Sequence, residues 1–282
     1  KGRREWFETF LELPNGIPSH DTFGRVFALL SPTGLEAGFV KWVQSVAHVL
    51  EGEVVAIDGK TLRRSYDSAS DTAAIHMVSA WASRNSMVLG QLKTEAKSNE
   101  ITAIPELLKV LELKGCIVTL DALGCQKKIA AQIVEQGADY VLGLKGNQSN
   151  LHEAVQERFE QVRQQEPQTG EGDGYYERTE KGHGRVETRR CWILPADKEL
   201  PDYQQWESLE TLVCIESERS VADETTTESR YFISSLDCSA EQMAVERPPH
   251  AVDGDIRERR EIGPGAMRDE MDFVARRQIA RQ

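Results

Sequence analysis

Two aspartates in the first half of the chain each follow a short apolar run typical of a buried strand. Asp58 comes after Val54 to Ile57, and Asp121 comes after Cys116 to Leu120. Two neighbouring carboxylates can hold one divalent ion, and with a third they can hold two ions that drive in-line attack on a phosphodiester. Carboxylate oxygens suit Mg²⁺ or Mn²⁺, whereas zinc prefers Cys or His. The pair therefore predicts metal-dependent phosphodiester chemistry.

The elements that must position this pair lie between residues 51 and 165, in the predicted order β-β-β-α-β-α-β-α. The first three strands are close enough in sequence to form an antiparallel meander, and the later βα units add parallel strands by crossover. This mixed order is the plan of a ribonuclease H-like α/β domain, in which the first and fourth strands are neighbours. Asp58 and Asp121 would each end one of these two strands, so we expect their carboxylates to meet at one edge of the sheet.

The segments on either side of this core have other patterns. Residues 1–50 show helical periodicity, with Ser19 placed to cap a helix, and predict an N-terminal helical segment. Residues 166–240 begin with a polar, glycine-rich linker and continue with alternating strands, which predicts a β-rich insertion or a small appended sheet. Residues 241–282 form an atypical tail: from residue 245 onward it has no lysine and eight arginines.

Composition limits the classes of protein that are possible. The 282 residues carry a formal net charge of −12, which argues mildly against nucleic acid, although a nuclease must also gather carboxylates. No stretch approaches the ~18 apolar residues needed to cross a bilayer. Five scattered cysteines without metal spacing predict reduced thiols in a cytoplasmic protein, and the six histidines give no zinc pattern. The chain opens on Lys rather than Met, as expected of a fragment of a longer protein.

Several sequence blocks, in order along the chain, resemble the H-repeat-associated branch of bacterial insertion-sequence DDE transposases. The resemblance covers roughly residues 5 to 244. The blocks are Leu13 to Phe23, Val55 to Ser65 around Asp58, Lys97 to Pro105, Asp121 to Gln126, Asp139 to Gln148, and Gly182 to Arg190.

This resemblance implies a function and a set of partners. Asp58 and Asp121 would be the first two members of a catalytic triad that binds Mg²⁺ or Mn²⁺. The substrate would be double-stranded DNA, both insertion-sequence ends and target, cut and joined by a homo-oligomer on DNA in the bacterial cytoplasm, associated with the nucleoid. The β-rich stretch would be the insertion that this branch carries before its third member, a glutamate.

The segment that should supply this glutamate is missing from the sequence. The family's last block has the form His-Trp-x-Ile-Glu-Asn-x-x-His-Trp on a helix. After Val245 the chain has neither a His-Trp pair nor a Glu-Asn pair, and two adjacent prolines, Pro248 and Pro249, would break the expected helix. We interpret the lysine-free tail as the product of a reading-frame change near residue 244. Three glutamates of the tail, Glu258, Glu261 and Glu270, lie in a charged segment with little periodicity, which predicts a solvated tail rather than a ligand.

Other polar residues of these blocks are candidates for contact with DNA. Lys60, Arg63 and Arg64 follow the first aspartate and could grip phosphate, or could form a solvated face. Another group follows the fifth strand or lies in the last matching block, where DNA contact competes with a role in turn structure: Lys145, Asn147, His183 and Arg185. Cys125 has no positioned base nearby in sequence and is expected to be a buried thiol.

The leading hypothesis is thus a DDE transposase that cleaves and joins DNA, with its activity in question because the third carboxylate is missing. A non-catalytic DNA-binding remnant and a host ribonuclease H-like nuclease remain open. A more remote alternative is an aspartyl-phosphate enzyme built on Asp58 to Thr61, which the three-strand meander disfavours.

Overall fold

The computed structural model describes residues 4–31, 34–35, 37–39, 41–42, 52–61, 76–83, 87–94, 100–165, 174–182, 185–221 and 224–246. The chain divides into two compact units, residues 1–48 and residues 49–282, and each is described by itself. Within the described residues, no helix is long and apolar enough to cross a membrane.

The first unit contains two described helices, α1 (Arg4–Glu8) and α2 (His20–Leu29), and neither has a buried residue. The predicted cap of α2 is confirmed, because the Ser19 hydroxyl accepts a hydrogen bond from the backbone N–H of Thr22 at 3.3 Å. This bond satisfies one of the N–H groups that a helix leaves unpaired at its start.

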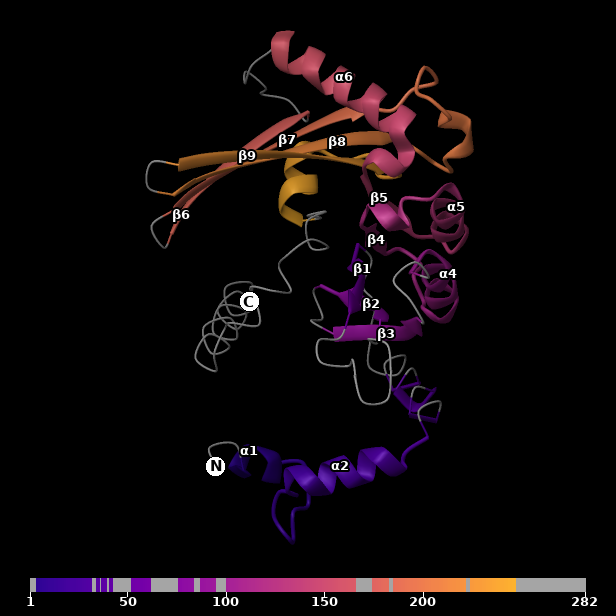
Figure 1. Cartoon of the computed structure of the whole chain (residues 1–282), viewed down its shortest axis with the longest axis vertical. Coiled ribbons are helices and arrows are strands. Elements are labelled where there is room, and N and C mark those ends of the chain that lie inside the picture. Colours follow the sequence, from indigo (N-terminus) through magenta and orange to yellow (C-terminus); the bar gives the residue numbers. More distant parts are fainter. Residues whose placement is uncertain are drawn as a thin grey trace, which may run out of the picture. The chain divides into compact units, whose positions relative to one another are not determined.

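The second unit contains a mixed α/β fold (Figure 1). Up to α6 its described elements follow the predicted order, while β6 had not been predicted. In chain order they are β1 (Val54–Thr61), β2 (His76–Ala82), β3 (Met87–Thr94), α4 (Glu100–Val110), β4 (Ile117–Leu120), α5 (Lys127–Glu135), β5 (Asp139–Leu144), α6 (Ser149–Gln165), β6 (Tyr175–Gly182), β7 (Arg185–Pro195), β8 (Thr211–Val221), β9 (Glu224–Ser234) and a short π-helix, η5 (Gln242–Glu246).

All of these strands belong to one mixed sheet of nine strands, in the order β3-β2-β1-β4-β5-β9-β8-β7-β6. The first three pair antiparallel, and β1, β4 and β5 pair parallel to one another. β9 returns antiparallel to β5 and begins a meander through β8 and β7 to β6. The strands of the β-rich interval therefore continue the same sheet, and we call β6 to β9 the ribbon.

Helices cover one face of the sheet, which we call the helix face. Leu107 of α4 and Leu111, which follows the end of α4, pack over Gly90 in β3, and Phe159 of α6 packs against Tyr231 in β9. The strands under these helices are apolar on this side, where Ile57, Leu120, Leu142 and Ile233 form a row across the sheet.

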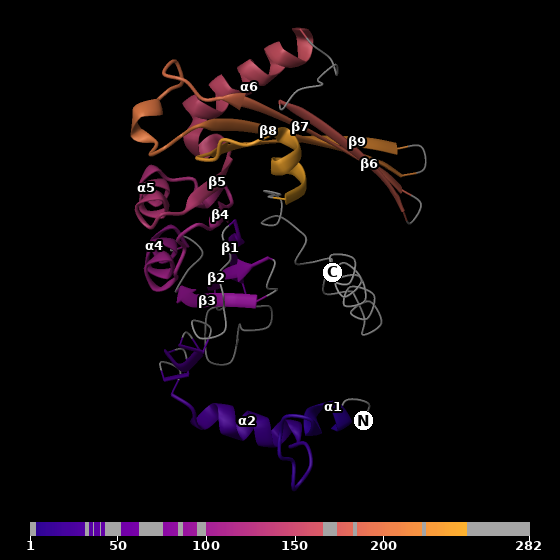
Figure 2. The same cartoon turned by 180° about the vertical axis from the view of Figure 1, so that it is seen from behind.

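The opposite face carries an apolar cluster built from the parallel strands, the ribbon and the segment that follows it. Val54, Ile117 and Val141 come from the parallel strands, and Met243 comes from η5. Figures 1 and 2 show α6 on one side of the ribbon and the gold helix η5 on the other. Because β4 and β5 are buried on both faces, they can be apolar throughout, as their sequences had predicted.

Candidate active site

The strand register brings Asp58 and Asp121 side by side. β1 and β4 run parallel, and the last paired residues are Ile57 and Leu120, so each aspartate is the next residue on its strand. Neighbouring strands lie about 4.8 Å apart, and alternate side chains point to opposite faces. Counting from Val54 and Ile117, both carboxylates project from the face that carries the apolar cluster. We call this the aspartate face.

The expectation that each aspartate ends its strand is wrong for Asp58. β1 continues to Thr61, because β2 supplies partners as far as the pair Thr61 and His76, whereas β4 stops at Leu120. Asp58 therefore lies inside a strand that is paired on one side only at this point. The side from which β4 is absent is the side on which Asp121 lies.

The Asp121 side chain is held by the backbone of the turn that it begins. Its Oδ1 accepts hydrogen bonds from the N–H groups of Leu123 at 3.0 Å and Gly124 at 3.3 Å, and so caps the short 3₁₀ helix η2 (Ala122–Gly124). Both bonds use one oxygen. Within the part of the chain that the structure describes, Oδ2 has no hydrogen-bond partner.

The surroundings of the pair suit a hard cation. Thr119, two residues before Asp121 and on the same face, is fully buried, and its hydroxyl has no partner among the described residues. Ser79 of β2 lies directly opposite Asp58 and shares its face. Carboxylate and hydroxyl oxygens are ligands of Mg²⁺ rather than zinc. In the described segments, however, no group of three or more His, Cys, Asp or Glu side chains is arranged to hold a metal ion.

Glu100 contacts the residue after Asp58 on the helix face, and sequence reasoning missed this contact. Its carboxylate lies against Gly59, where a Cβ atom would be 2.6 Å from Oε2 and 2.7 Å from Oε1, so any larger residue at this position would displace the Glu100 carboxylate. Glu100 is buried at the start of α4, with 7% of its surface exposed. A glutamate is common in the first turn of a helix because its charge interacts favourably with the helix dipole, so its presence there did not indicate this contact.

Lys145 and Asp121 line the same cleft of about 170 Å³, together with Glu228, Arg230 and His152. Arg230 holds the Glu228 carboxylate through two hydrogen bonds of 3.0 Å. The pKa of Glu228 is lowered, chiefly by Arg230 and to a lesser degree by Lys145. The exposed Lys145 ammonium is therefore close enough to the Glu228 carboxylate to stabilise its negative charge.

Asn147 lies closer to the aspartate than its position after β5 had indicated. Its side-chain amide donates a hydrogen bond of 2.6 Å to the carbonyl of Ala122, the residue that follows Asp121. The neighbouring Gln148 donates to the carbonyl of Cys125 at 3.0 Å. The two amides thus join the β5–α6 connection to the turn that begins at Asp121.

Arg185 lies at the far end of the ribbon from these residues. Its guanidinium forms an ion pair with Glu187 at 3.0 Å, and the guanidinium groups of Arg189 and Arg219 lie 3.7 and 3.8 Å from the same carboxylate. By strand alternation from Cys191, a member of the apolar cluster, these side chains lie on the aspartate face. β9 continues from Arg230 to Glu224 beyond its pairing with β5, so the ribbon extends roughly 20 Å past that end of the sheet.

Most of the remaining residues that were predicted to contact DNA lie outside the residues that the structure describes. Lys60 belongs to β1, where it pairs with Met77, and its side chain is not described. Arg63, Arg64 and His183 lie outside the described residues, as does the tail from residue 247 onward with Glu258, Glu261 and Glu270.

Cys125 is a buried thiol, as expected. Burial raises its pKa to about 12, and the nearby Asp121 charge acts in the same direction. A thiol with such a pKa carries almost no thiolate at neutral pH, so Cys125 is not a nucleophile.

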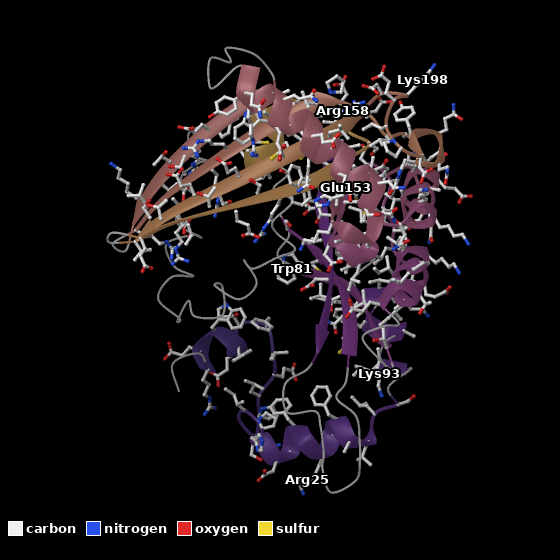
Figure 3. All side chains as sticks on the ribbon, turned by 45° about the horizontal axis from the view of Figure 1, so that its top comes forward. Arg25, Trp81, Lys93, Glu153, Arg158 and Lys198 are labelled. Atoms are coloured by element: carbon white, nitrogen blue, oxygen red, sulfur yellow. The ribbon has the colours of Figure 1, made fainter. Side chains whose placement is uncertain are left out.

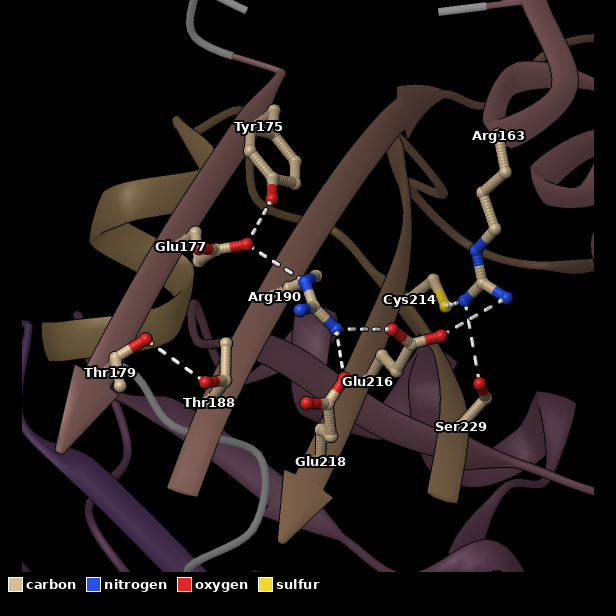
Figure 4. Close-up of polar contacts among 10 residues, drawn as sticks. All are labelled: Arg163, Tyr175, Glu177, Thr179, Thr188, Arg190, Cys214, Glu216, Glu218 and Ser229. Atoms are coloured by element: carbon tan, nitrogen blue, oxygen red, sulfur yellow. Dashed lines mark hydrogen bonds and ion pairs between the residues drawn. The ribbon is translucent and has the colours of Figure 1, made fainter. Parts of the chain in front are cut away.

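On the helix face of the ribbon, carboxylates are bound by arginine instead (Figure 4). Arg190 donates to Glu177 at 2.8 Å and to Glu216 and Glu218 at 3.0 Å each. The Tyr175 hydroxyl also donates to Glu177, and this bond, followed by that from Arg190, lowers the pKa of Glu177. These contacts tie three strands of the ribbon together.

Comparison with known proteins identifies the class. The sequence matches a family model described as a transposase DDE domain over residues 50–247, and one described as DDE_Tnp_1-associated over residues 1–43. The chain belongs to the DDE transposase family.

Its relatives agree with this class. The "Uncharacterized protein in dhlA 3'region" of Xanthobacter autotrophicus is 45% identical, over 82% of this chain and 76% of that protein. The "H repeat-associated putative transposase YhhI" of Escherichia coli K12 is 42% identical over 85% of this chain, but the match spans only 64% of that longer protein. The "H repeat-associated putative transposase YbfD" of the same strain is 42% identical over 71% of this chain and 77% of that protein.

Among solved structures, the cryo-EM structure of a piggyBac transposase synaptic complex with hairpin DNA is similar over 72% of this chain and 39% of that chain. The sequence identity is 10% and the TM-score is 0.37, which is too low to argue a shared fold.

Proposed function

We propose that the chain is the catalytic domain of a DDE transposase, in which Asp58 and Asp121 bind Mg²⁺ or Mn²⁺ for cleavage and strand transfer of insertion-sequence ends. The β1–β4 register carries this proposal, because it aligns two carboxylates on one face beside the point where β4 stops. A bound divalent ion supplies activation of the attacking hydroxyl and neutralisation of the leaving oxygen. Asp121 would present Oδ2 to such an ion while the turn N–H groups hold its Oδ1.

The first five strands support a ribonuclease H-like assignment for this core. Their order in the sheet is β3-β2-β1-β4-β5, with an antiparallel meander followed by parallel crossovers. In such an order the two aspartate-bearing strands are neighbours, which is the arrangement that a shared metal site requires. The helices of the crossovers then lie on the other face and leave the aspartate face for DNA.

We propose double-stranded DNA as the partner, bound along the aspartate face and the ribbon. Support comes from the gathering of Arg185, Arg189 and Arg219 on a single carboxylate, an arrangement with more positive than negative charge. Lys145 at the aspartate end would add a further phosphate contact, as would Lys60, Arg63, Arg64 and His183. The protein would act as a homo-oligomer on bacterial DNA in the cytoplasm.

A second candidate is a DNA-binding remnant without catalysis. The observation that favours it is that the described residues contain no group of three His, Cys, Asp or Glu side chains arranged to hold a metal ion. A frame change near residue 244 would explain this, and sequencing the locus tests that explanation. An adjacent frame that encodes the His-Trp and Glu-Asn block supports it, and an adjacent frame without the block removes it.

The decisive experiment is cleavage of DNA that carries the ends of the chain's own insertion sequence, with Mg²⁺ or Mn²⁺. An active transposase nicks these ends, and both Asp58→Ala and Asp121→Ala abolish the nicking while DNA binding persists. Binding without cleavage in the unaltered chain establishes the remnant instead. Cleavage that ignores the end sequence points to a ribonuclease H-like nuclease.

A further inference from the structure

Two side-chain hydrogen bonds join the connection between β5 and α6 to the turn that begins at Asp121, although the two segments lie far apart in the sequence. Asn147 and Gln148 reach across 25 and 23 residues to the carbonyls of Ala122 and Cys125, which lie in the turn after Asp121. The 2.6 Å bond from Asn147 is the shorter of the two, and its acceptor is the residue directly after the aspartate. A carbonyl acceptor requires the amide nitrogen to face it, so the orientation of the Asn147 side chain is defined.

Gly143 in β5 allows this close approach. A Cβ atom at this position would lie 3.2 Å from the backbone nitrogen of Ala122 and 3.3 Å from the carbonyl carbon of Asp121. β5 therefore packs directly on the backbone at Asp121. Ala122 is thus approached by β5 at its backbone nitrogen and by the Asn147 amide at its carbonyl oxygen, so two consecutive peptide groups of the turn are in contact with this part of the chain.

The bond to Ala122 fixes the orientation of the turn whose N–H groups hold Asp121. Leu123 and Gly124 donate to Asp121 Oδ1, and both follow Ala122 in the short helix η2. The Ala122 carbonyl and the Leu123 N–H belong to one peptide group, and the Gly124 N–H belongs to the next. If the first of these groups rotates, the Leu123 N–H turns away and the Gly124 N–H shifts, so Oδ1 loses one or both bonds. The direction of Oδ2 then becomes variable as well.

We propose that Asn147 is a positioning residue for Asp121: it holds the η2 turn so that Oδ2 faces Asp58, with Gln148 and Gly143 in support. The role differs from the phosphate contact predicted from the sequence. It rests on the proposed function, because it assumes that Asp121 binds a metal ion. Groups that orient a metal ligand commonly change metal affinity by about 10- to 100-fold when removed.

The test measures Mn²⁺ affinity by calorimetry on the whole chain and five variants. Asn147→Ala should weaken binding about tenfold. Asn147→Asp has nearly the same shape but lacks the donor, and should also weaken binding, although its added negative charge alone would tighten it. Asn150→Ala is the matched control, because Asn150 is an exposed asparagine in the first turn of α6, and among the described residues its side chain has one hydrogen bond, from Ser149 at 3.5 Å. This variant should bind Mn²⁺ as the unaltered chain does.

Two further variants separate this proposal from the function on which it rests. Asp121→Ala should remove most of the Mn²⁺ affinity, and if it does not, the metal pair itself is wrong. Gln148→Ala should weaken binding less than Asn147→Ala. If Asp121→Ala weakens binding while Asn147→Ala and Asn147→Asp do not, the metal pair stands and the positioning role is overturned.

Amide hydrogen exchange without metal gives a second readout. Exchange at Leu123 and Gly124 should become several-fold faster in Asn147→Ala, and should stay unchanged in Asn150→Ala. Unchanged exchange at both amides in Asn147→Ala would overturn the positioning role, whatever the metal affinity.

Discussion

The two ends of the sheet hold their carboxylates in different ways. In the ribbon, Glu177, Glu216 and Glu218 converge on Arg190, so a cation from the protein itself neutralises them. At the parallel end, Asp121 is held by two backbone N–H groups, and none of the described ion pairs includes it. Backbone donors orient a carboxylate without cancelling its charge. The ribbon network therefore neutralises its carboxylates within the sheet, whereas the bonds to Asp121 leave the negative charge of this carboxylate in place.

The largest expected effect is on metal binding at the aspartate end. Asp58→Asn and Asp121→Asn should each weaken Mn²⁺ binding at least about 100-fold, more than the loss typical of outer-shell partners. Without metal, both variants should be at least as stable as the unaltered chain, because one of two neighbouring like charges is gone. Thermal unfolding with and without Mn²⁺ measures both quantities.

The control for this prediction is a carboxylate of the ribbon. Glu180→Gln removes an exposed partner of Arg178 and should leave the Mn²⁺-induced rise in melting temperature intact. An equal rise in the two asparagine variants would contradict the distinction between the two ends.

Arg190→Ala should instead destabilise the fold without changing metal binding. It leaves the partly buried Glu216 and Glu218 and the exposed Glu177 without their shared cation, which should lower the free energy of unfolding by about 2–3 kcal/mol. Arg178→Ala is the matched control, since its pair with Glu180 is exposed and should contribute less than about 1 kcal/mol. Urea unfolding curves compare the two. Equal losses of unfolding free energy in the two variants would show that the Arg190 network stabilises the fold no more than an exposed ion pair does.

Gly59→Ala tests the close contact behind Asp58. The added methyl group collides with the buried Glu100 carboxylate, so the free energy of unfolding should fall by about 1–3 kcal/mol and Mn²⁺ binding should weaken. Gly182→Ala in the ribbon is the control, because nothing lies within 4 Å of the new methyl group there. It should be neutral or slightly stabilising. A neutral Gly59→Ala would show that Glu100 can move aside.

The smallest effect concerns a surface ion pair. Arg158 (labelled in Figure 3) donates two hydrogen bonds to Asp197, at 2.6 and 3.0 Å, and these lower the pKa of the Asp197 carboxyl. A lowered pKa in the folded state stabilises the fold above the unfolded-state pKa, near 3.9, and this contribution disappears as the pH falls through the folded value.

The pair is half exposed, so its contribution should be below about 1 kcal/mol. The difference in unfolding free energy between the unaltered chain and Arg158→Ala should be constant from pH 7 to 5 and shrink below about pH 4. A difference that grows on acidification contradicts this assignment.

Much of the core could be predicted from sequence because its signals are local. Apolar runs and turn residues predicted the element order up to α6, and Ser19 predicted the start of α2. The position of Asp121 after a buried run was informative for the same reason. The order of strands along the chain was enough to predict that β1 and β4 are neighbours.

The features that were missed depend on contacts between distant residues. Nothing within β1 shows that β2 continues its pairing to Thr61, or that the Glu100 side chain fills the space over Gly59. The bond between Asn147 and the Ala122 carbonyl was not predicted, because the two residues lie 25 positions apart in the sequence. β6 was missed because its exposed, polar sequence gives no apolar alternation. Register and side-chain contact are set by the packed sheet, which local periodicity does not describe.

The most direct test of the metal pair is a crystal structure of the chain soaked in Mn²⁺, with an anomalous difference map. The account predicts a manganese peak bounded by the carboxylates of Asp58 and Asp121, with Asp121 Oδ2 as a ligand and Oδ1 still bonded to Leu123 and Gly124. A fully ordered site without such a peak, or a peak held by other residues, would contradict it.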